Sequence, residues 1–247
     1  MPRRWVELNA EQAVAADFIT QRRLFGDAYC RLQPDYFFAM PEASGVFVLP
    51  FAPVTAVSPS ATRPGDIDLL ILPYEGDELV LDRAMAIEVK VVRARFDRPG
   101  RSPNEFGFSQ AEALLELGFP YVAVAHLIVS NESPEDAWEE MMGYQVLDQY
   151  GKVGEQFFQR IDTLPIQLIN RAYGRLEKAC KRAELGLTSA FVRYANPEVA
   201  RRHAKSTWYA EGREAQRSPR ASPDLMRAVG RLFATAPEIW FDNPRRG

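Results

Sequence analysis

Four charged residues lie in two segments that are otherwise apolar. Asp66 and Asp68 open one apolar run, and Glu88 and Lys90 alternate with aliphatic side chains in another, residues 85–92. Successive side chains of a β-strand point to opposite faces. If both runs are strands, Asp66 and Asp68 share one face, and so do Glu88 and Lys90. Each strand then carries charges at positions that should otherwise be buried.

Carboxylates gathered at buried positions indicate a bound cation. A buried carboxylate without a partner loses its hydration, so it either costs free energy or changes its pKa. Mg²⁺ suits such a pair because it takes few protein oxygens and completes its shell with water and substrate phosphate. A lysine two residues from a metal-binding glutamate can orient the attacking water or stabilise charge developing on a phosphate. The pattern therefore predicts metal-assisted hydrolysis.

The two runs resemble the signature of the PD-(D/E)XK, or restriction-endonuclease-like, nucleases. They read Gly-Asp-Ile-Asp-Leu-Leu-Ile at residues 65–71 and Ile-Glu-Val-Lys at residues 87–90. The resemblance covers about residues 9–130. In that superfamily an acid on one strand and Glu-x-Lys on the next hold one or two Mg²⁺ ions. The resemblance implies a metal-dependent nuclease, with DNA favoured over RNA as its substrate.

Roles for individual residues follow from this resemblance. Asp68 and Glu88 would bind Mg²⁺ (or Mn²⁺) together with the carbonyl group of Val89, and Lys90 would act on the attacking water. Many members carry a glutamine on the helix after the Glu-x-Lys strand, and Gln110 fits that place.

The sequence leaves two role assignments undecided. Gly-Asp-Ile-Asp stands where the family has Pro-Asp, so Asp66 competes with Asp68 for the ligand role. Asp68 is favoured because it lies further into the strand. Some members have an acid on the first helix, for which Glu11 is the nearest candidate. A first-turn acid is also favoured simply by the helix dipole.

The surrounding pattern predicts an α/β fold with a mixed central sheet and flanking helices, as in a restriction-endonuclease-like core. The nuclease core is assigned to residues 1–131. The expected elements are a helix over about 9–26, strands at 36–39, 46–51, 67–72 and within 79–92, a helix over about 108–117, and a strand over 121–129, apolar throughout as if covered on both faces.

Residues 132–247 are predicted to be a helical, basic extension packed on or beside this core. Helix starts are expected at Ser133, near Pro165 and at Ser222. Residues 201–220 are expected to be a loop. Residues 171–247 hold 16 Lys and Arg against 8 Asp and Glu, which suggests an anionic partner.

Four arginines follow the Glu-x-Lys strand in a loop containing proline and glycine, and this loop is expected at the rim of the catalytic cleft. Arginine pairs well with phosphate, and nearby cations would offset the acidic site. We therefore predict that nucleic acid is bound by Arg93, Arg95, Arg98 and Arg101.

Other interpretations compete with a nuclease. The four charged residues could form an ordinary solvated sheet face. A nuclease fold that has lost its metal site could serve as a nucleic-acid-binding or scaffold module, although the full set of charged residues argues against that. Residues 107–111 resemble the nucleophile turn of serine hydrolases only weakly, because the final glycine is missing.

Location and assembly are judged from composition. The N-terminal residues lack the apolar stretch of a secretion signal, and the longest apolar run is far shorter than the ~20 residues of a membrane helix. We expect a cytoplasmic protein without membrane association, with Cys30 and Cys180 as free thiols. The apolar stripe at residues 166–180 could be core, which is favoured, or the seam of a homodimer; a larger complex is also open.

Overall fold

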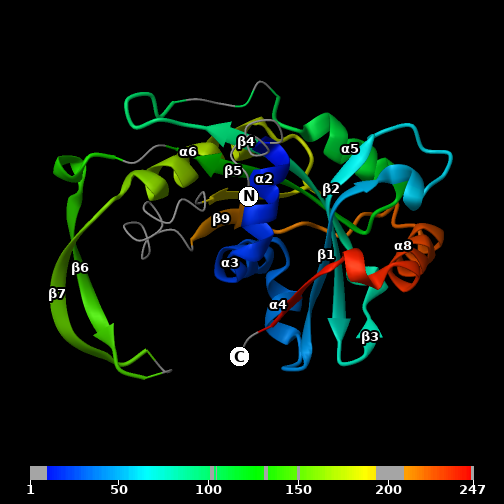
Figure 1. Cartoon of the computed structure of the whole chain (residues 1–247), viewed down its shortest axis with the longest axis horizontal. Helices are drawn as coiled ribbons and strands as arrows, with labels where there is room; N and C mark the ends of the chain where they lie inside the picture. Colours follow the sequence, from blue (N-terminus) through cyan, green and yellow to red (C-terminus); the bar gives the residue numbers. More distant parts are fainter. Residues whose placement is uncertain are drawn as a thin grey trace.

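The structure is a computed structural model that describes residues 10–100, 103, 105–130, 133–148, 151–192 and 209–245. A central sheet of eight strands carries helices on both faces (Figure 1). The sheet is mixed, so the predicted α/β class with flanking helices is confirmed at this level. Within the described part of the chain, no helix is long and apolar enough to span a membrane, and both cysteines are free.

The strands follow the order β10-β1-β2-β4-β5-β8-β9, with β3 paired to β2. β4, β5 and β8 are mutually parallel, and the other pairs are antiparallel. All nine residues of β5 are buried, as expected for a strand covered on both faces. The strands are β1 (Ser44–Pro53), β2 (Asp66–Glu75), β3 (Glu78–Leu79), β4 (Met85–Arg93), β5 (Tyr121–Val129), β8 (Gly186–Phe191), β9 (Ala210–Arg213) and β10 (Phe241–Pro244).

One face of the sheet is covered by α2 (Ala10–Thr20), α3 (Arg22–Leu32) and α4 (Pro34–Ala39). The single helix predicted over 9–26 is divided at Gln21, whose backbone is not helical, and Asn9 lies outside the described residues. The strand predicted at 36–39 is wrong. Pro34 in the first turn, followed by Asp35, starts a helix there instead.

The opposite face is covered by α5 (Phe108–Leu117), α6 (Leu164–Ala179) and α8 (Pro223–Thr235). α5 lies where it was predicted, between two glycines with positive φ, and Ser222 caps α8 through a hydrogen bond from the backbone of Leu225. The short 3₁₀ helices are η1 (Val54–Ala56), η2 (Leu81–Arg83), η3 (Glu135–Ala137) and η4 (Pro237–Ile239).

The C-terminal half differs from the predicted helical extension. β8, β9 and β10 belong to the central sheet, so residues after 131 complete the same layer as the candidate site. The helix expected from Ser133 is only the turn η3, and β6 (Glu139–Val146) and β7 (Val153–Ile161) follow as a separate hairpin (Figure 1). β6 itself begins with good helix formers, so its extended form depends on pairing with β7, which is rich in β-branched and aromatic residues.

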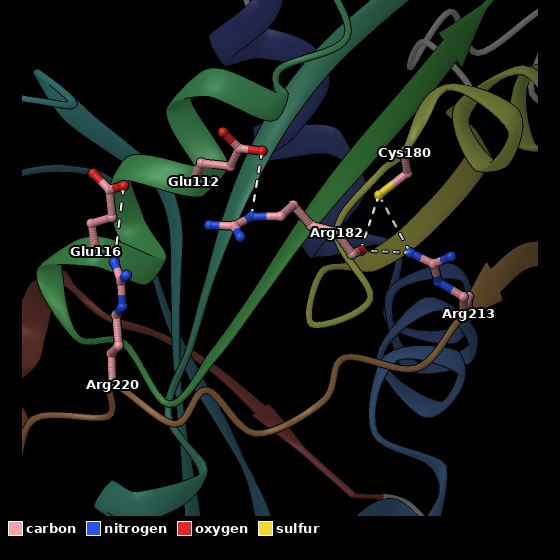
Figure 2. Close-up of polar contacts among 6 residues, drawn as sticks. All are labelled: Glu112, Glu116, Cys180, Arg182, Arg213 and Arg220. Carbon is pink, nitrogen blue, oxygen red and sulfur yellow. Dashed lines mark hydrogen bonds and ion pairs between the residues drawn. The ribbon is translucent and has the colours of Figure 1, made fainter.

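Polar contacts join α5 to Arg182 and Arg220 in the C-terminal half (Figure 2). These ion pairs join partly exposed side chains and contribute little free energy each, so apolar packing carries most of the attachment. The contacts of α5 are Glu112 Oε1 to Arg182 Nε at 3.6 Å and Glu116 Oε1 to Arg220 Nη1 at 4.0 Å. Within the C-terminal half, Arg213 Nη2 donates to the Arg182 carbonyl at 3.2 Å and to Cys180 Sγ at 3.4 Å.

Candidate functional site

The ladder between β2 and β4 ends at the predicted carboxylates. These strands are antiparallel with Leu69 opposite Ile87, so one step further places Asp68 opposite Glu88. The backbone N–H of Val89 donates to Asp68 Oδ2 at 2.7 Å, which holds the aspartate against β4. Asp66, in contrast, is exposed. The structure therefore brings Asp68 rather than Asp66 to the Glu-x-Lys strand.

Glu88 and Lys90 form an ion pair on one face of β4. Lys90 Nζ lies 2.8 Å from Glu88 Oε1, and the lysine and glutamate side chains are 19% and 2% exposed, respectively. A charge-assisted hydrogen bond at this distance fixes both groups. Glu88 is thus nearly sealed from water, while the lysine still reaches solvent.

Asp68 disfavours the ionisation of Glu88, whereas the hydrogen bond from Glu88 lowers the pKa of Asp68. Burial, and then the charge of Asp68, raise the pKa of Glu88 to about 7 against the opposing effect of Lys90. Burial is also the main cause that raises the pKa of Asp68, and the charge of Glu11 adds to it. Burial lowers the pKa of Lys90, but its acidic neighbours outweigh this and raise it overall. Such a pair gains from an added cation.

The N-terminus of α5 lies beside this pair. Gly107 precedes the helix with a φ of +86°, and a Cβ there would lie 2.9 Å from Glu88 Cγ. Gln110 is on the first turn of α5, and its buried Oε1 has no hydrogen-bond partner among the described residues. Gly107 was not predicted as a site residue. A glycine directly before a helix is the signal that could have identified it.

His126 lies next to Lys90 in the register between β4 and β5. It is 1% exposed, and its Nε2 lies 3.3 Å from the carbonyl oxygen of Phe106. Burial lowers the pKa of His126 to about 4. The ring is therefore neutral at pH 7, and Nε2 carries the proton because a carbonyl oxygen can only accept.

The donor set fits a hard cation with few protein ligands. Asp68 and Glu88 supply carboxylate oxygens on adjacent strands, and the carbonyl group of Val89 is the third predicted ligand. Among the residues that the structure describes, no group of three or more His, Cys, Asp or Glu side chains gathers as a metal site. Mg²⁺ keeps several waters in its shell, so two carboxylates and one carbonyl group are the kind of protein donors that it takes.

The predicted phosphate-binding loop is only partly described. Arg93, Arg95 and Arg98 are exposed, and Arg101 lies outside the described residues. Arg95 Nε is paired with Asp97 Oδ1 at 2.9 Å. Leu176 of α6 packs in the same apolar cluster as Leu114 of α5, so this basic helix lies on the same side of the sheet as the site. The charge of its Arg175 contributes to lowering the pKa of His126.

Comparisons with known proteins identified no relative of this chain. No protein-family model matches the chain, and no match was found among the curated proteins or the solved structures. Any functional assignment therefore rests on the chemistry of the site itself.

Proposed function

We propose that this protein is a metal-dependent nuclease of the PD-(D/E)XK type, which hydrolyses phosphodiester bonds, preferably in DNA. The observation that carries the proposal is that Val89 N–H holds Asp68 against β4 at 2.7 Å, while Lys90 is bound to Glu88 at 2.8 Å on the same strand. Two partly or fully buried carboxylates with raised pKa values beside a lysine are typical of a catalytic centre.

Each group has a distinct part in this proposal. Asp68, Glu88 and the Val89 carbonyl would hold Mg²⁺ or Mn²⁺, which supplies positive charge for the phosphate and its nucleophile. Lys90 donates hydrogen bonds to the attacking water or to a phosphate oxygen. Its ion pair with Glu88 holds the ammonium group in place. Gln110, on the first turn of α5, would offer its amide to the same centre.

Metal dependence is the first test. The chain is incubated with supercoiled plasmid, single-stranded DNA and RNA, each in Mg²⁺, Mn²⁺, Ca²⁺ or EDTA. We expect cleavage with Mg²⁺ or Mn²⁺, none in EDTA, and binding without turnover in Ca²⁺. Undiminished cleavage in excess EDTA contradicts the proposal. Binding without cleavage in every metal would instead assign the chain as an inactive nucleic-acid-binding module.

A second test concerns how the substrate is held. Arginines can pair with phosphates, so replacing those of the loop after β4 should weaken binding on all sequences. It should also make the plot of log affinity against log salt concentration less steep. The slope should change by about 0.9 for each duplex phosphate that the variant no longer neutralises. The replaced residues are Arg93, Arg95, Arg98 and Arg101, each changed to serine in the cleavage-deficient Lys90→Ala background.

The matched comparison changes the basic residues on and just after α6 in the same background. An unchanged affinity and slope in the loop variant, with weaker binding in the α6 variant, would move the binding surface to α6. The residues changed in this comparison are Arg171, Arg175, Lys178 and Arg182.

A further inference from the structure

The hairpin of β6 and β7, called the arm below (residues 139–161), exposes much apolar surface. Exposed large apolar side chains are normally scattered singly, and a contiguous group marks an interaction site. Those on the arm range from 42% to 68% exposed. They are Met141, Met142, Tyr144, Val146, Leu147, Val153, Phe157 and Phe158.

One face of the arm is the more available for contact. Met142 is paired with Phe158 across the ribbon, and strand alternation places Tyr144 on the same face. Phe157 points to the other face, where its ring covers Gly143 so closely that a Cβ there would lie 2.7 Å away. An isolated two-stranded ribbon is marginally stable in water, so this open face needs a cover.

The root of the arm is anchored, which gives the arm a defined direction. Ser133 donates to the buried carboxylate of Asp162, which also accepts from the backbone N–H of Leu164 at 3.0 Å. Arg160 Nη2 donates to the carbonyl oxygens of Glu135 at 2.6 Å and Trp138 at 3.2 Å. Beyond this root the arm projects from the body, and neither strand packs extensively on another described element (Figure 1).

The body carries an apolar cavity of about 620 Å³ between α3, α4, β1 and β10, and none of the described arm residues lines it. Its apolar lining includes Phe25, Phe37, Met40 and Val46. Three arginines also line it, among them Arg245, which lies over the Phe37 ring. Among the described residues, therefore, the arm packs extensively on no other element, and no arm residue covers the cavity.

Their charges are complementary. The arm has four acidic and two basic side chains, a net charge of −2. The cavity is lined by Arg22, Arg23 and Arg245 against the single acid Asp27, a net charge of +2. An acidic arm is repelled by nucleic acid and by anionic membranes, whereas the arginine-lined cavity attracts it.

We propose that the chain forms a symmetric homodimer in which the arm of each copy inserts its Met142–Phe158 face into the cavity of the other. The same two surfaces then meet twice, as a closed two-fold assembly requires. Each copy covers the apolar surface that its partner leaves open. This inference does not depend on nuclease activity, and its test measures assembly alone.

Cross-linking can test the contact because Cys30 lines the cavity. In a Cys180→Ser background, Phe158→Cys adds a thiol to the arm, and a short bismaleimide joins nearby thiols. We expect a covalent dimer with Phe158→Cys. The control Ile239→Cys, at a position 50% exposed outside the arm, should give none. No dimer with Phe158→Cys, or an equal yield after Cys30→Ser, would overturn the proposed contact.

Mass measurement by light scattering over a range of concentrations supplies an independent readout. We expect the unmodified chain to dimerise, and Phe158→Glu to raise the dimer dissociation constant by about 30-fold, as for removal of an interface hot spot. The matched variant Gln159→Glu adds the same charge on the opposite face and should leave dimerisation unchanged. A chain that stays monomeric at every concentration, or equal effects of the two variants, would refute the dimer.

Discussion

Glu88→Gln should reduce phosphodiester cleavage by about 10³-fold, since several kcal/mol of charge stabilisation are lost and 1.36 kcal/mol corresponds to tenfold. Glutamine keeps the shape of the side chain and can still accept from Lys90, so the fold should survive. The charge that would hold a cation is removed. Single-turnover cleavage of plasmid in saturating Mg²⁺, with circular dichroism as a check on folding, measures the effect.

Neighbouring variants make this result specific. Asp68→Asn and Lys90→Ala should reduce cleavage by a comparable factor, because both groups contact the same centre. Asp66→Asn is the matched control: it removes a carboxylate two residues away that is exposed, and cleavage should persist. Full activity in Glu88→Gln would refute the catalytic assignment. Inactivity of Asp66→Asn together with full activity of Asp68→Asn would reverse the roles of the two aspartates.

The same glutamate should make the metal-free protein less stable as the pH rises. Its pKa is raised from 4.5 to about 7 on folding. The folded state therefore keeps a proton that the unfolded state releases, and stability present below pH 4.5 is lost as the pH rises to about 7. At 1.36 kcal/mol per pKa unit, the decrease approaches about 3 kcal/mol, an amount shared with the neighbouring Asp68.

Comparison with Glu88→Gln isolates this contribution. Chemical denaturation of both proteins in EDTA, at a series of pH values, gives the difference in their free energies of unfolding. Between pH 4.5 and 7, the free energy of unfolding of the unmodified protein should fall relative to that of Glu88→Gln. His126 has the opposite effect, because its contribution to stability is lost as the pH falls from 6.5 to about 4. Both proteins contain His126, so its effect cancels in the comparison. Mg²⁺ should restore the stability of the unmodified protein but not that of Glu88→Gln. Parallel pH profiles for the two proteins would contradict the expectation.

Local patterns in the sequence determined the elements that carry the candidate site. Alternation of charged and aliphatic residues predicted β2 and β4, an unbroken apolar run predicted β5, and the helix expected over about 108–117 is α5. These predictions succeeded because side-chain alternation and helix ends depend on residues close together in the chain. They also placed Glu88 and Lys90 on one face, where the structure joins them in an ion pair.

Only the tertiary structure decided which groups from different elements meet. Asp66 and Asp68 are equivalent by alternation, and the end of the β2–β4 ladder brings Asp68 against Val89. Gly107 reaches Glu88 through a loop closure that no short pattern encodes. The strands β8, β9 and β10 were missed for the same reason. Their stability comes from pairing with residues far away in sequence, which favours an extended conformation that local propensity alone does not specify.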